Sequence, residues 1–279
     1  MKTKDIKRNY KLIASDLDGT LLSSSAELSK ENSDAIDGIA KKGVIFAPTT
    51  GRALYEIPAS VRNHKSVRYL ITSNGAVITD IRSGLTNKAL IDRDTFFRAY
   101  NIMKEYSVFF TVHHEGMSYV DELLVSDPIM ESYRMTEYYK NHIRKTNAKI
   151  PYFDDYFFSG ISPEMICGFF RYDREMKECI ERLNALGFLH VTGSESGSIE
   201  VISQFASKGN ALVSLANRLD ISIEDCIGIG DSPNDTTLIE AAGLGLATSN
   251  AAASLKSIAD EVICSNNEHV AKFVLEKLL

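Results

Sequence analysis

The chain has 279 residues, of which 44% are hydrophobic and 24% charged, as is typical of a soluble globular protein with one large or two ordinary domains. Its net charge of −6 gives no electrostatic basis for binding nucleic acid or an anionic membrane. The polar start, MKTKDIKRNY, has no apolar signal segment, and no later run approaches the roughly 20 apolar residues of a membrane span. We therefore expect a cytoplasmic protein without a nucleic-acid or membrane partner.

The cysteines and histidines show no metal-binding spacing. The six histidines form neither an HxxxH nor an HExxH pattern, and the adjacent His113 and His114 would point to opposite faces of a strand. There is no CxxC pair, and three of the four cysteines lie in apolar runs. We expect all four to be reduced residues of the core: Cys167, Cys179, Cys226 and Cys264.

The N-terminal part of the chain alternates between strand and helix patterns. Its apolar runs predict strands near residues 10–16, 43–49 and 69–75. Between the first two runs, Ser29 is a suitable N-cap and Gly43 a suitable terminator for an amphipathic helix. This order predicts βαβ units.

The middle of the chain has a different character. Runs rich in aromatic and strand-forming residues lie at 107–114, 117–125 and 165–173. Two stretches have helical spacing, at 96–103 and 176–183. Turn-rich stretches, IRSGLTN and TGSESGS, flank it as possible hinges. We predict an inserted α+β domain over 86–192, within a core domain made of 1–85 and 193–279.

The last part of the chain returns to the alternating pattern. Helical spacing is found at 208–219 and near 270–278, and apolar runs predict strands at 226–231, 244–249 and 261–265. Alternation of strands and helices is the signature of a parallel sheet. The two ends of the chain are therefore expected to share one such sheet.

Asp16 and Asp18 directly follow the first predicted strand, in the run KLIASDLDGTLL. Two carboxylates about 4 Å apart repel each other by roughly 4 kcal/mol at an effective dielectric constant near 20, so the pair needs compensation. A parallel sheet binds its ligand beyond the carboxyl ends of its strands, which is where these acids are expected. We therefore expect them to bind a cation.

Other polar residues are predicted at the same edge of the sheet. GDSPND follows a second apolar run, TTGR follows a third, and a lysine opens a helix after the run IEVISQFAS. These motifs supply carboxylates, a hydroxyl with backbone N–H groups, and an ammonium group: Asp231, Asn234, Asp235, Thr50, Gly51 and Lys208. Such groups are ligands for a hard cation and donors for a phosphate.

The motifs DLDGTLL, TTGR, SNGA, SKGNAL and GDSPND occur in the order and spacing of a known family. In them the chain resembles the Cof-like branch (subfamily IIB) of the haloacid dehalogenase (HAD) superfamily, whose members are mostly Mg²⁺-dependent phosphatases. The motifs lie at both ends of the chain, and the insertion matches the large C2-type cap of that branch in position and size. The resemblance implies an α/β fold: a Rossmann-like parallel-sheet core with an inserted α+β cap domain.

The resemblance also implies a role for each motif residue. Asp16 would be the nucleophile and Asp18 the general acid/base. The Asp16 carboxylate, the Asp18 backbone carbonyl and Asp231 would hold Mg²⁺, and Asp235 would support this metal shell. The phosphoryl group would be contacted by the Leu17 and Gly51 backbones and by the side chains of Thr50, Lys208 and Asn234.

Three of these residues have simpler explanations. Asp18, before Gly19, could cap a turn, and Lys208 taken alone could be a solvated lysine at the start of a helix. Asn74 could support the site or could do no more than form a turn with Gly75.

The resemblance implies a phosphatase that hydrolyses a small phosphorylated metabolite, such as a sugar, nucleotide or cofactor phosphate, as a monomer or weak homodimer. Two other functions stay open: a phospho-ligand-binding or regulatory protein with little turnover, and a phosphomutase. The cap would supply most of the leaving-group pocket, since the core motifs contact only the phosphoryl group and the metal. Candidates for this pocket, each of which could equally lie in the core or at the surface, are His113, His114, Tyr119 and Arg171.

Overall fold

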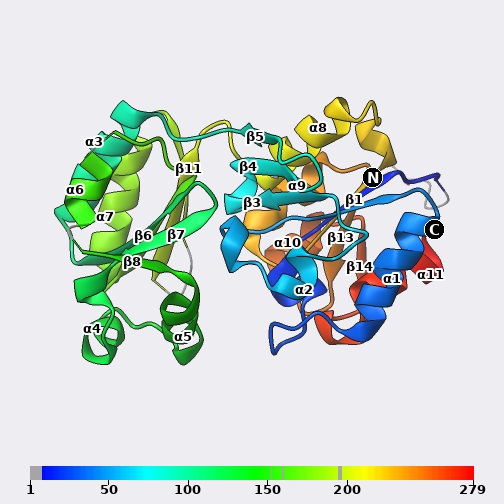
Figure 1. The fold of residues 1–279 in the computed structure, drawn as a ribbon, viewed down its shortest axis with the longest axis horizontal. Helices are drawn as coiled ribbons and strands as arrows, with labels where there is room; N and C mark the ends of the chain where they lie inside the picture. The colour runs from blue at the N-terminus through cyan, green and yellow to red at the C-terminus, as the bar shows by residue number, and fades with distance from the viewer. Residues whose placement is uncertain (1–7, 152, 159, 194–196) are drawn as a thin grey trace. The chain divides into compact units, whose positions relative to one another are not determined.

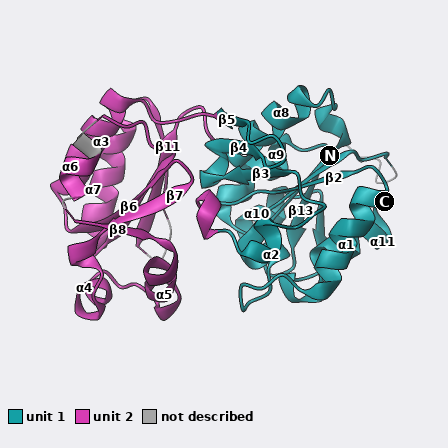
Figure 2. Ribbon diagram, viewed as in Figure 1, with its two compact units in different colours: residues 1–51, 57–87, 207–279 teal, residues 52–56, 88–206 magenta. Residues whose placement is uncertain are grey.

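The computed structural model in Figure 1 describes residues 8–151, 153–158, 160–193 and 197–279. They belong to two compact units (Figure 2). Unit 1 comprises 1–51, 57–87 and 207–279, and unit 2 comprises 52–56 and 88–206. Within the described ranges, none of the helices has the length and apolar character needed to span a bilayer. Most of the polar N-terminal segment, residues 1–7, lies outside the described residues.

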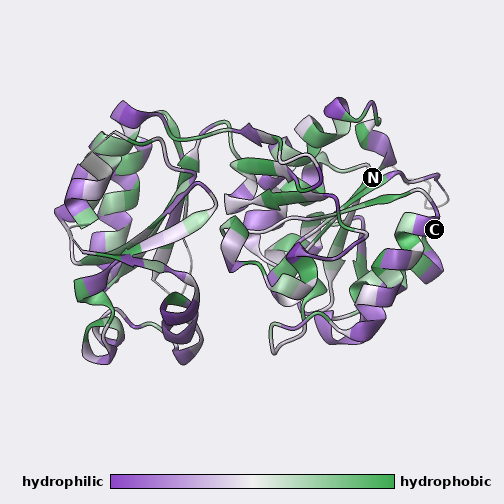
Figure 3. Ribbon diagram, viewed as in Figure 1, coloured by the Kyte–Doolittle hydropathy of each residue, from purple (hydrophilic) through white to green (hydrophobic). Residues whose placement is uncertain are grey.

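Unit 1 is built around a five-stranded parallel sheet in the order β14-β13-β12-β1-β2. Its strands are β1 (Leu12–Ser15), β2 (Ile45–Pro48), β12 (Cys226–Gly230), β13 (Leu244–Thr248) and β14 (Glu261–Ile263). In the register, Leu12 of the central strand lies opposite Cys226 on one side and Ile45 on the other. The prediction that both ends of the chain share one parallel sheet is confirmed. The strands of this sheet are predominantly hydrophobic, as Figure 3 shows, because helices cover them.

The first helix of unit 1 begins and ends at the expected signals, and the unit contains five other helices among the described residues. The helices are α1 (Lys30–Lys41), α2 (Ala59–Arg62), α8 (Lys208–Arg218), α9 (Thr236–Ala241), α10 (Ala253–Ile258) and α11 (Val270–Lys277). Ser29 caps α1 by accepting a hydrogen bond from the Asn32 N–H, and Gly43 follows the helix with a positive φ of 78°. Helices α1 and α11, from opposite ends of the chain, pack side by side (Figure 1).

One predicted strand of the βαβ pattern pairs differently. β3 (Tyr69–Thr72) forms an antiparallel hairpin with β4 (Val77–Asp80), and this hairpin continues into β5 (Thr86–Lys88). A single parallel bridge, between Thr49 and Ile71, links it to the main sheet. The tight turn at Ser73–Gly75 directs the chain back along β3 instead of into a crossover helix.

Unit 2 contains a six-stranded sheet in the order β10-β11-β9-β6-β7-β8, antiparallel except for the β7–β8 pair. Its strands are β6 (Val108–His114), β7 (Met117–Asp121), β8 (Ala148–Ile150), β9 (Met165–Phe170), β10 (Leu189–Gly193) and β11 (Ser198–Ser203). Its helices are α3 (Arg93–Lys104), α4 (Asp127–Ser132), α5 (Glu137–Thr146), α6 (Phe153–Phe158) and α7 (Asp173–Asn184). Helices α3, α6 and α7 gather on one face of the sheet in Figure 1, and the apolar side chains of α3 and α7 are buried there.

The boundary between the units differs from the predicted one. The predicted core segment 193–279 begins too early, because β11 pairs with both β10 and β9 in the unit 2 sheet. The predicted hinge TGSESGS begins in β10 and ends in β11, which pair with each other in unit 2, and its residues 194–196 lie outside the described residues. Turn-forming residues signal a change of direction and do not specify which sheet the next strand enters. Lys208 consequently follows the boundary at 206/207 and not a strand of the parallel sheet.

The unit boundaries predict a shorter protein that folds. The Asn87 side chain donates a hydrogen bond to Ser214 Oγ of α8 at 3.0 Å, so the chain leaves unit 1 beside the helix at which it returns. Replacing residues 88–206 with a flexible linker of about six residues should therefore give a soluble domain that unfolds cooperatively in urea. Circular dichroism measures this. Deleting 86–192 instead should cause aggregation, because Ile199 and Val201 would lose the sheet that buries them. Non-cooperative unfolding of the first variant would contradict the division.

Candidate active site

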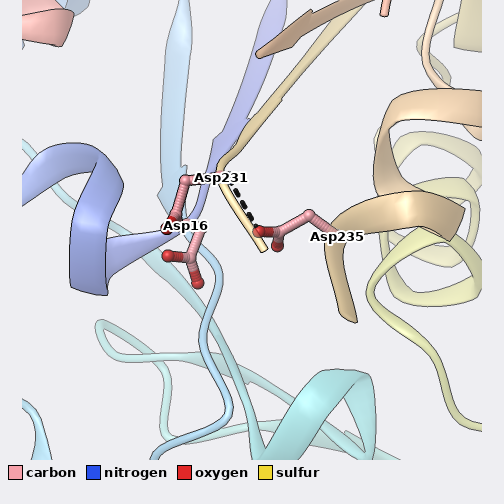
Figure 4. Close-up of side chains that lie close together, drawn as sticks. All are labelled: Asp16, Asp231 and Asp235. Carbon is pink, nitrogen blue, oxygen red and sulfur yellow. Dashed lines mark hydrogen bonds between the residues drawn. The ribbon is translucent and has the colours of Figure 1, made fainter. Parts of the chain in front are cut away.

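Three carboxylates meet at the carboxyl edge of the parallel sheet. Asp16 directly follows β1, and Asp231 directly follows the neighbouring strand β12. Asp235 ends the helical turn Pro233–Asp235, four residues further along the chain. One oxygen of each carboxylate lies within 4.8 Å of one oxygen of the others. Figure 4 shows the three side chains. The parallel pairing of two strands thus brings together motifs that are about 200 residues apart in the sequence.

Lys208 joins two of these acids from the first turn of α8. Its Nζ donates to Asp16 Oδ1 at 2.7 Å and to Asp235 Oδ1 at 2.6 Å, and only 1% of the side chain is exposed. Burial lowers the pKa of the ammonium group, but the charges of Asp16 and Asp235 outweigh this effect and raise the pKa above its ordinary value. Lys208 therefore stays charged in the site. Ser207 caps α8 by accepting the Asn210 N–H. This cap fixes the start of the helix and therefore the position of Lys208, its first residue.

One lysine does not balance three carboxylates. Burial, followed by the neighbouring Asp235 and Asp231 carboxylates, raises the pKa of Asp16 well above its usual range, although Lys208 opposes this shift. Burial and Asp235 likewise raise the pKa of Asp231 to about 6. Both shifts have the same origin, namely excess negative charge in a region of low dielectric constant. A further cation would relieve the repulsion.

The oxygens at the site fit Mg²⁺. Asp235 is already occupied, because its Oδ1 binds Lys208 and its Oδ2 accepts the N–H groups of Asp231 and Ser232 at 3.0 and 3.1 Å. Oδ2 of Asp16 and Oδ2 of Asp231 accept no hydrogen bond from the part of the chain that the structure describes. An oxygen-only ligand set is what a hard divalent cation prefers. We conclude that Asp16 and Asp231 could hold the metal, while Asp235 holds their loop in place.

Gly19 keeps this region open. Its φ is +76°, and a Cβ atom at this position would lie 2.4 Å from Asp231 Oδ2. The neighbouring Thr20 donates its hydroxyl to Asp231 Oδ1 at 3.0 Å, a contact that the sequence analysis did not predict. Asp18 lies in the same turn, Leu17–Leu21, at a position where the backbone is not helical. It is half-buried and outside the group of three carboxylates.

The predicted phosphate-binding residues lie on loops that hydrogen bonds hold together. Thr50 is buried, its N–H donates to the Ile71 carbonyl at 2.8 Å, and its carbonyl accepts the Asn74 N–H at 3.0 Å. Asn74 Oδ1 in turn accepts the Asn234 amide at 3.2 Å. Asn74 has a left-handed conformation, with φ 53° and ψ 35°. The two interpretations of Asn74 are therefore compatible, since it forms the turn and also orients Asn234.

The leaving-group candidates of unit 2 have varied surroundings. Tyr119 packs against Tyr156 with ring centroids 5.2 Å apart, and Arg171 donates to Ser132 Oγ at 2.8 Å. His114 lines a cavity together with Lys88, Glu115, Ser162 and Glu164. His113 is buried, with its Nε2 3.6 Å from Glu56 Oε2. The sequence analysis did not single out Glu56, because it is one acid in the largely apolar stretch RALYEIPAS and belongs to no recognised motif.

Comparisons with known proteins agree with this geometry. The family model for haloacid dehalogenase-like hydrolases matches residues 13–274. Phosphatase YwpJ of Bacillus subtilis is 30% identical over 286 residues, which cover 96% of this chain and all of the relative. The 5-amino-6-(5-phospho-D-ribitylamino)uracil phosphatase YwtE of the same organism is 28% identical, covering 96% of this chain and 98% of the relative. A solved haloacid dehalogenase-like hydrolase from B. subtilis has a TM-score of 0.82 and 30% identity, covering 96% of this chain and all of that one.

The raised pKa of Asp231 predicts a pH-dependent stability in metal-free protein. A carboxyl group with a pKa near 6 in the folded state binds its proton more tightly than in the unfolded state, where the pKa is close to 3.8. Tighter proton binding by Asp231 therefore adds at most about 3 kcal/mol to the free energy of unfolding. This stabilisation is complete below pH 4 and is lost as the pH rises through 6. Asp231→Asn should therefore gain stability relative to the parent protein between pH 4 and 7, measured by urea unfolding in chelator.

Mg²⁺ provides the matched comparison for this prediction. At pH 7 it should raise the melting temperature of the parent protein and leave that of Asp231→Asn nearly unchanged, because binding to the folded state stabilises it. A stability difference between the two proteins that stays constant from pH 4 to 7 would show that Asp231 titrates normally.

Proposed function

Because this chain belongs to the haloacid dehalogenase-like hydrolase family and is, like its relatives, a hydrolase of phosphoric monoesters, we propose that it is a Mg²⁺-dependent phosphatase of small phosphorylated metabolites. The observation that carries the proposal is the buried group of Asp16, Asp231 and Asp235 around Lys208. It combines a carboxylate that can attack phosphorus, oxygens suited to a hard cation, and a fixed positive charge.

In the proposed reaction, a carboxylate oxygen of Asp16 attacks the phosphorus of the ester. The bond from phosphorus to the leaving oxygen breaks, and Asp18 gives that oxygen a proton, which leaves an aspartyl phosphate on Asp16. Asp18 then takes a proton from a water molecule whose oxygen attacks the phosphorus. This step releases inorganic phosphate and restores the Asp16 carboxylate.

Burial and charge in the site support these roles. Asp16 is 4% exposed, and Lys208 at 2.7 Å stabilises its ionised, nucleophilic form. Asp18 is half-buried, as a residue that exchanges protons with water and with a leaving group needs to be. Mg²⁺, held by the Asp16 and Asp231 carboxylates and the Asp18 backbone carbonyl, would supply positive charge next to the phosphoryl oxygens.

The phosphoryl group itself would be bound by backbone and side-chain donors. We assign this role to the Leu17 and Gly51 backbones and to Thr50, Lys208 and Asn234, because charge accumulates on three phosphoryl oxygens during transfer. The Asn74 N–H donates to the Thr50 carbonyl, and the Asn234 amide donates to Asn74 Oδ1. These two hydrogen bonds support the assignment, since they fix two of the proposed phosphate-binding residues relative to each other before substrate binds.

The names of two relatives and a cavity in unit 2 support a proposal for the substrate class. Two relatives, YwtE and YcsE, are named as phosphatases of 5-amino-6-(5-phospho-D-ribitylamino)uracil, a phosphorylated metabolite. We propose a substrate of this size and polarity, with unit 2 as the cap that selects the leaving group. The cavity lined by Lys88, His114 and Glu115 offers both charges and an imidazole for recognising hydroxyl and amine groups.

The direct test is phosphate release from p-nitrophenyl phosphate by the purified protein. Activity should require Mg²⁺ and stop in chelator, and Asp16→Asn should lower kcat by roughly 10⁴-fold or more, because an amide cannot form the phosphoenzyme. Asp80→Asn is a matched control in unit 1, since Asp80 is a buried carboxylate bound by Arg68 at 2.9 Å and lies outside the site. It should keep most of the activity. Substantial turnover by Asp16→Asn would refute the nucleophile assignment.

A panel of sugar, nucleotide and cofactor phosphates tests the role of unit 2. His114→Ala and Lys88→Ala should change the relative kcat/KM values among these substrates while the Mg²⁺ requirement stays the same, because the altered residues would contact leaving groups only. The panel includes 5-amino-6-(5-phospho-D-ribitylamino)uracil. The same order of preference in both variants and the parent protein would exclude this cavity as the specificity determinant.

A further inference from the structure

Residues 52–56 are covalently joined to unit 1 at both ends and yet pack within unit 2, as Figure 2 shows by colour. Leu54–Glu56 form a helical turn, and the Tyr55 N–H donates to the Gly116 carbonyl at 2.9 Å in the tight β6–β7 turn. The segment begins immediately after Thr50 and Gly51, which we propose to bind the phosphoryl group. The chain therefore connects that loop to unit 2 directly.

Glu56 holds the segment in place. The residue is 6% exposed, and its carboxylate accepts the Ala53 N–H at 2.8 Å. His142 Nε2 of α5 lies 3.3 Å from Oε1, and His113 Nε2 of β6 lies 3.6 Å from Oε2. Burial alone would raise the pKa of Glu56, but His113 and His142 together lower it to about 2. The carboxylate is therefore ionised at any pH used for an assay.

Arg52 attaches the other end of the segment to the same helix. One guanidinium nitrogen donates to the Glu56 carbonyl at 2.9 Å, and another donates to the Tyr138 hydroxyl at 2.9 Å. The Tyr138 ring is stacked on His142, with centroids 6.2 Å apart and an interplanar angle of 12°. Two polar contacts to α5 thus fix both the position and the direction of the segment.

Packing alone does not explain a buried carboxylate at this position. An apolar side chain of similar volume would fill the same space without the cost of desolvating a charge. A metal ion does not explain it either. Among the described residues, the only group of three or more acid, histidine or cysteine side chains close enough together to share an ion is Asp16, Asp231 and Asp235. What the carboxylate adds is directional bonding to two different elements of unit 2.

We infer that Glu56 is a positioning residue for the phosphate-binding loop. By binding His113 and His142, it makes residues 52–56 part of unit 2, so that the chain directly after Thr50 and Gly51 is anchored. The inference rests on the proposed function, because that function assigns the loop to phosphate. Releasing the segment leaves the loop residues unchanged and lets them move, which weakens every contact made to the phosphoryl group.

Glu56→Gln tests the inference, because it keeps the shape and removes the charge. It should raise the inhibition constant of inorganic phosphate about tenfold and lower kcat/KM for p-nitrophenyl phosphate at least as much. His142→Gln removes one partner at a less buried position and should have a similar effect. The double variant should be no worse than the more impaired single one, because both changes release the same segment.

Glu175→Gln is the matched control in unit 2. Its carboxylate accepts the Ser107 N–H at 2.8 Å, and among the described residues it forms no hydrogen bond or ion pair with 52–56. This variant should leave the inhibition constant unchanged. Wild-type phosphate affinity in both Glu56→Gln and His142→Gln, with only a lower melting temperature, would overturn the inference and leave Glu56 with a structural role.

A second measurement separates the inference from the proposed function. Inorganic phosphate with Mg²⁺ should raise the melting temperature of the parent protein and raise that of Glu56→Gln by less, whether or not the protein turns over substrate. A parent protein that binds phosphate without hydrolysing esters would refute the phosphatase and leave the inference standing. Equal phosphate-induced shifts in both proteins would refute the inference alone, and no shift in either would refute both.

Discussion

The site depends on the contact of one buried ammonium group with two carboxylates. Lys208 lies at the start of α8, and its Nζ reaches Asp16 after β1 and Asp235 before α9. Burial and the neighbouring carboxylates raise the pKa of Asp16 and of Asp231, and the Lys208 charge opposes this shift at both. A divalent cation at the same two carboxylates would oppose it further. The contacts of Lys208 also join the two ends of the chain at the edge of the sheet.

The backbone around this contact is shaped to permit close approach. At Gly230 a Cβ atom would lie 2.4 Å from the Asp235 Cβ, and at Gly75 it would lie 2.1 Å from the Ser207 carbonyl. Any side chain at these positions would push α8 and the Asp235 turn away from the strands. The glycines therefore set the distances over which Lys208 and the carboxylates interact. Fold and electrostatics are specified by the same short motifs.

The sequence was sufficient to predict the parallel core and the group of residues at its edge. Those elements follow from local patterns: an apolar run, an acid at its end, and a cap such as Ser29 before a helix. The pairing of β11 with β9 and the hairpin formed by β3 and β4 were not predictable in this way, because both depend on a partner strand elsewhere. Glu56 was missed for the same reason, because its role depends on two histidines that are distant in the sequence, His113 and His142.

The discontinuity of unit 2 limits how this protein can exchange parts with its relatives. The main insertion, 88–206, is joined to unit 1 by two connections, but residues 52–56 add two more. A foreign segment in place of 88–206 would bring its own internal contacts. Residues 52–56, however, would lose the side chains against which they pack in unit 2. Glu56 would then be a buried charge without His113 and His142 to compensate it. An exchange of unit 2 between relatives therefore has to include both 52–56 and 88–206, the two segments that together make up the unit.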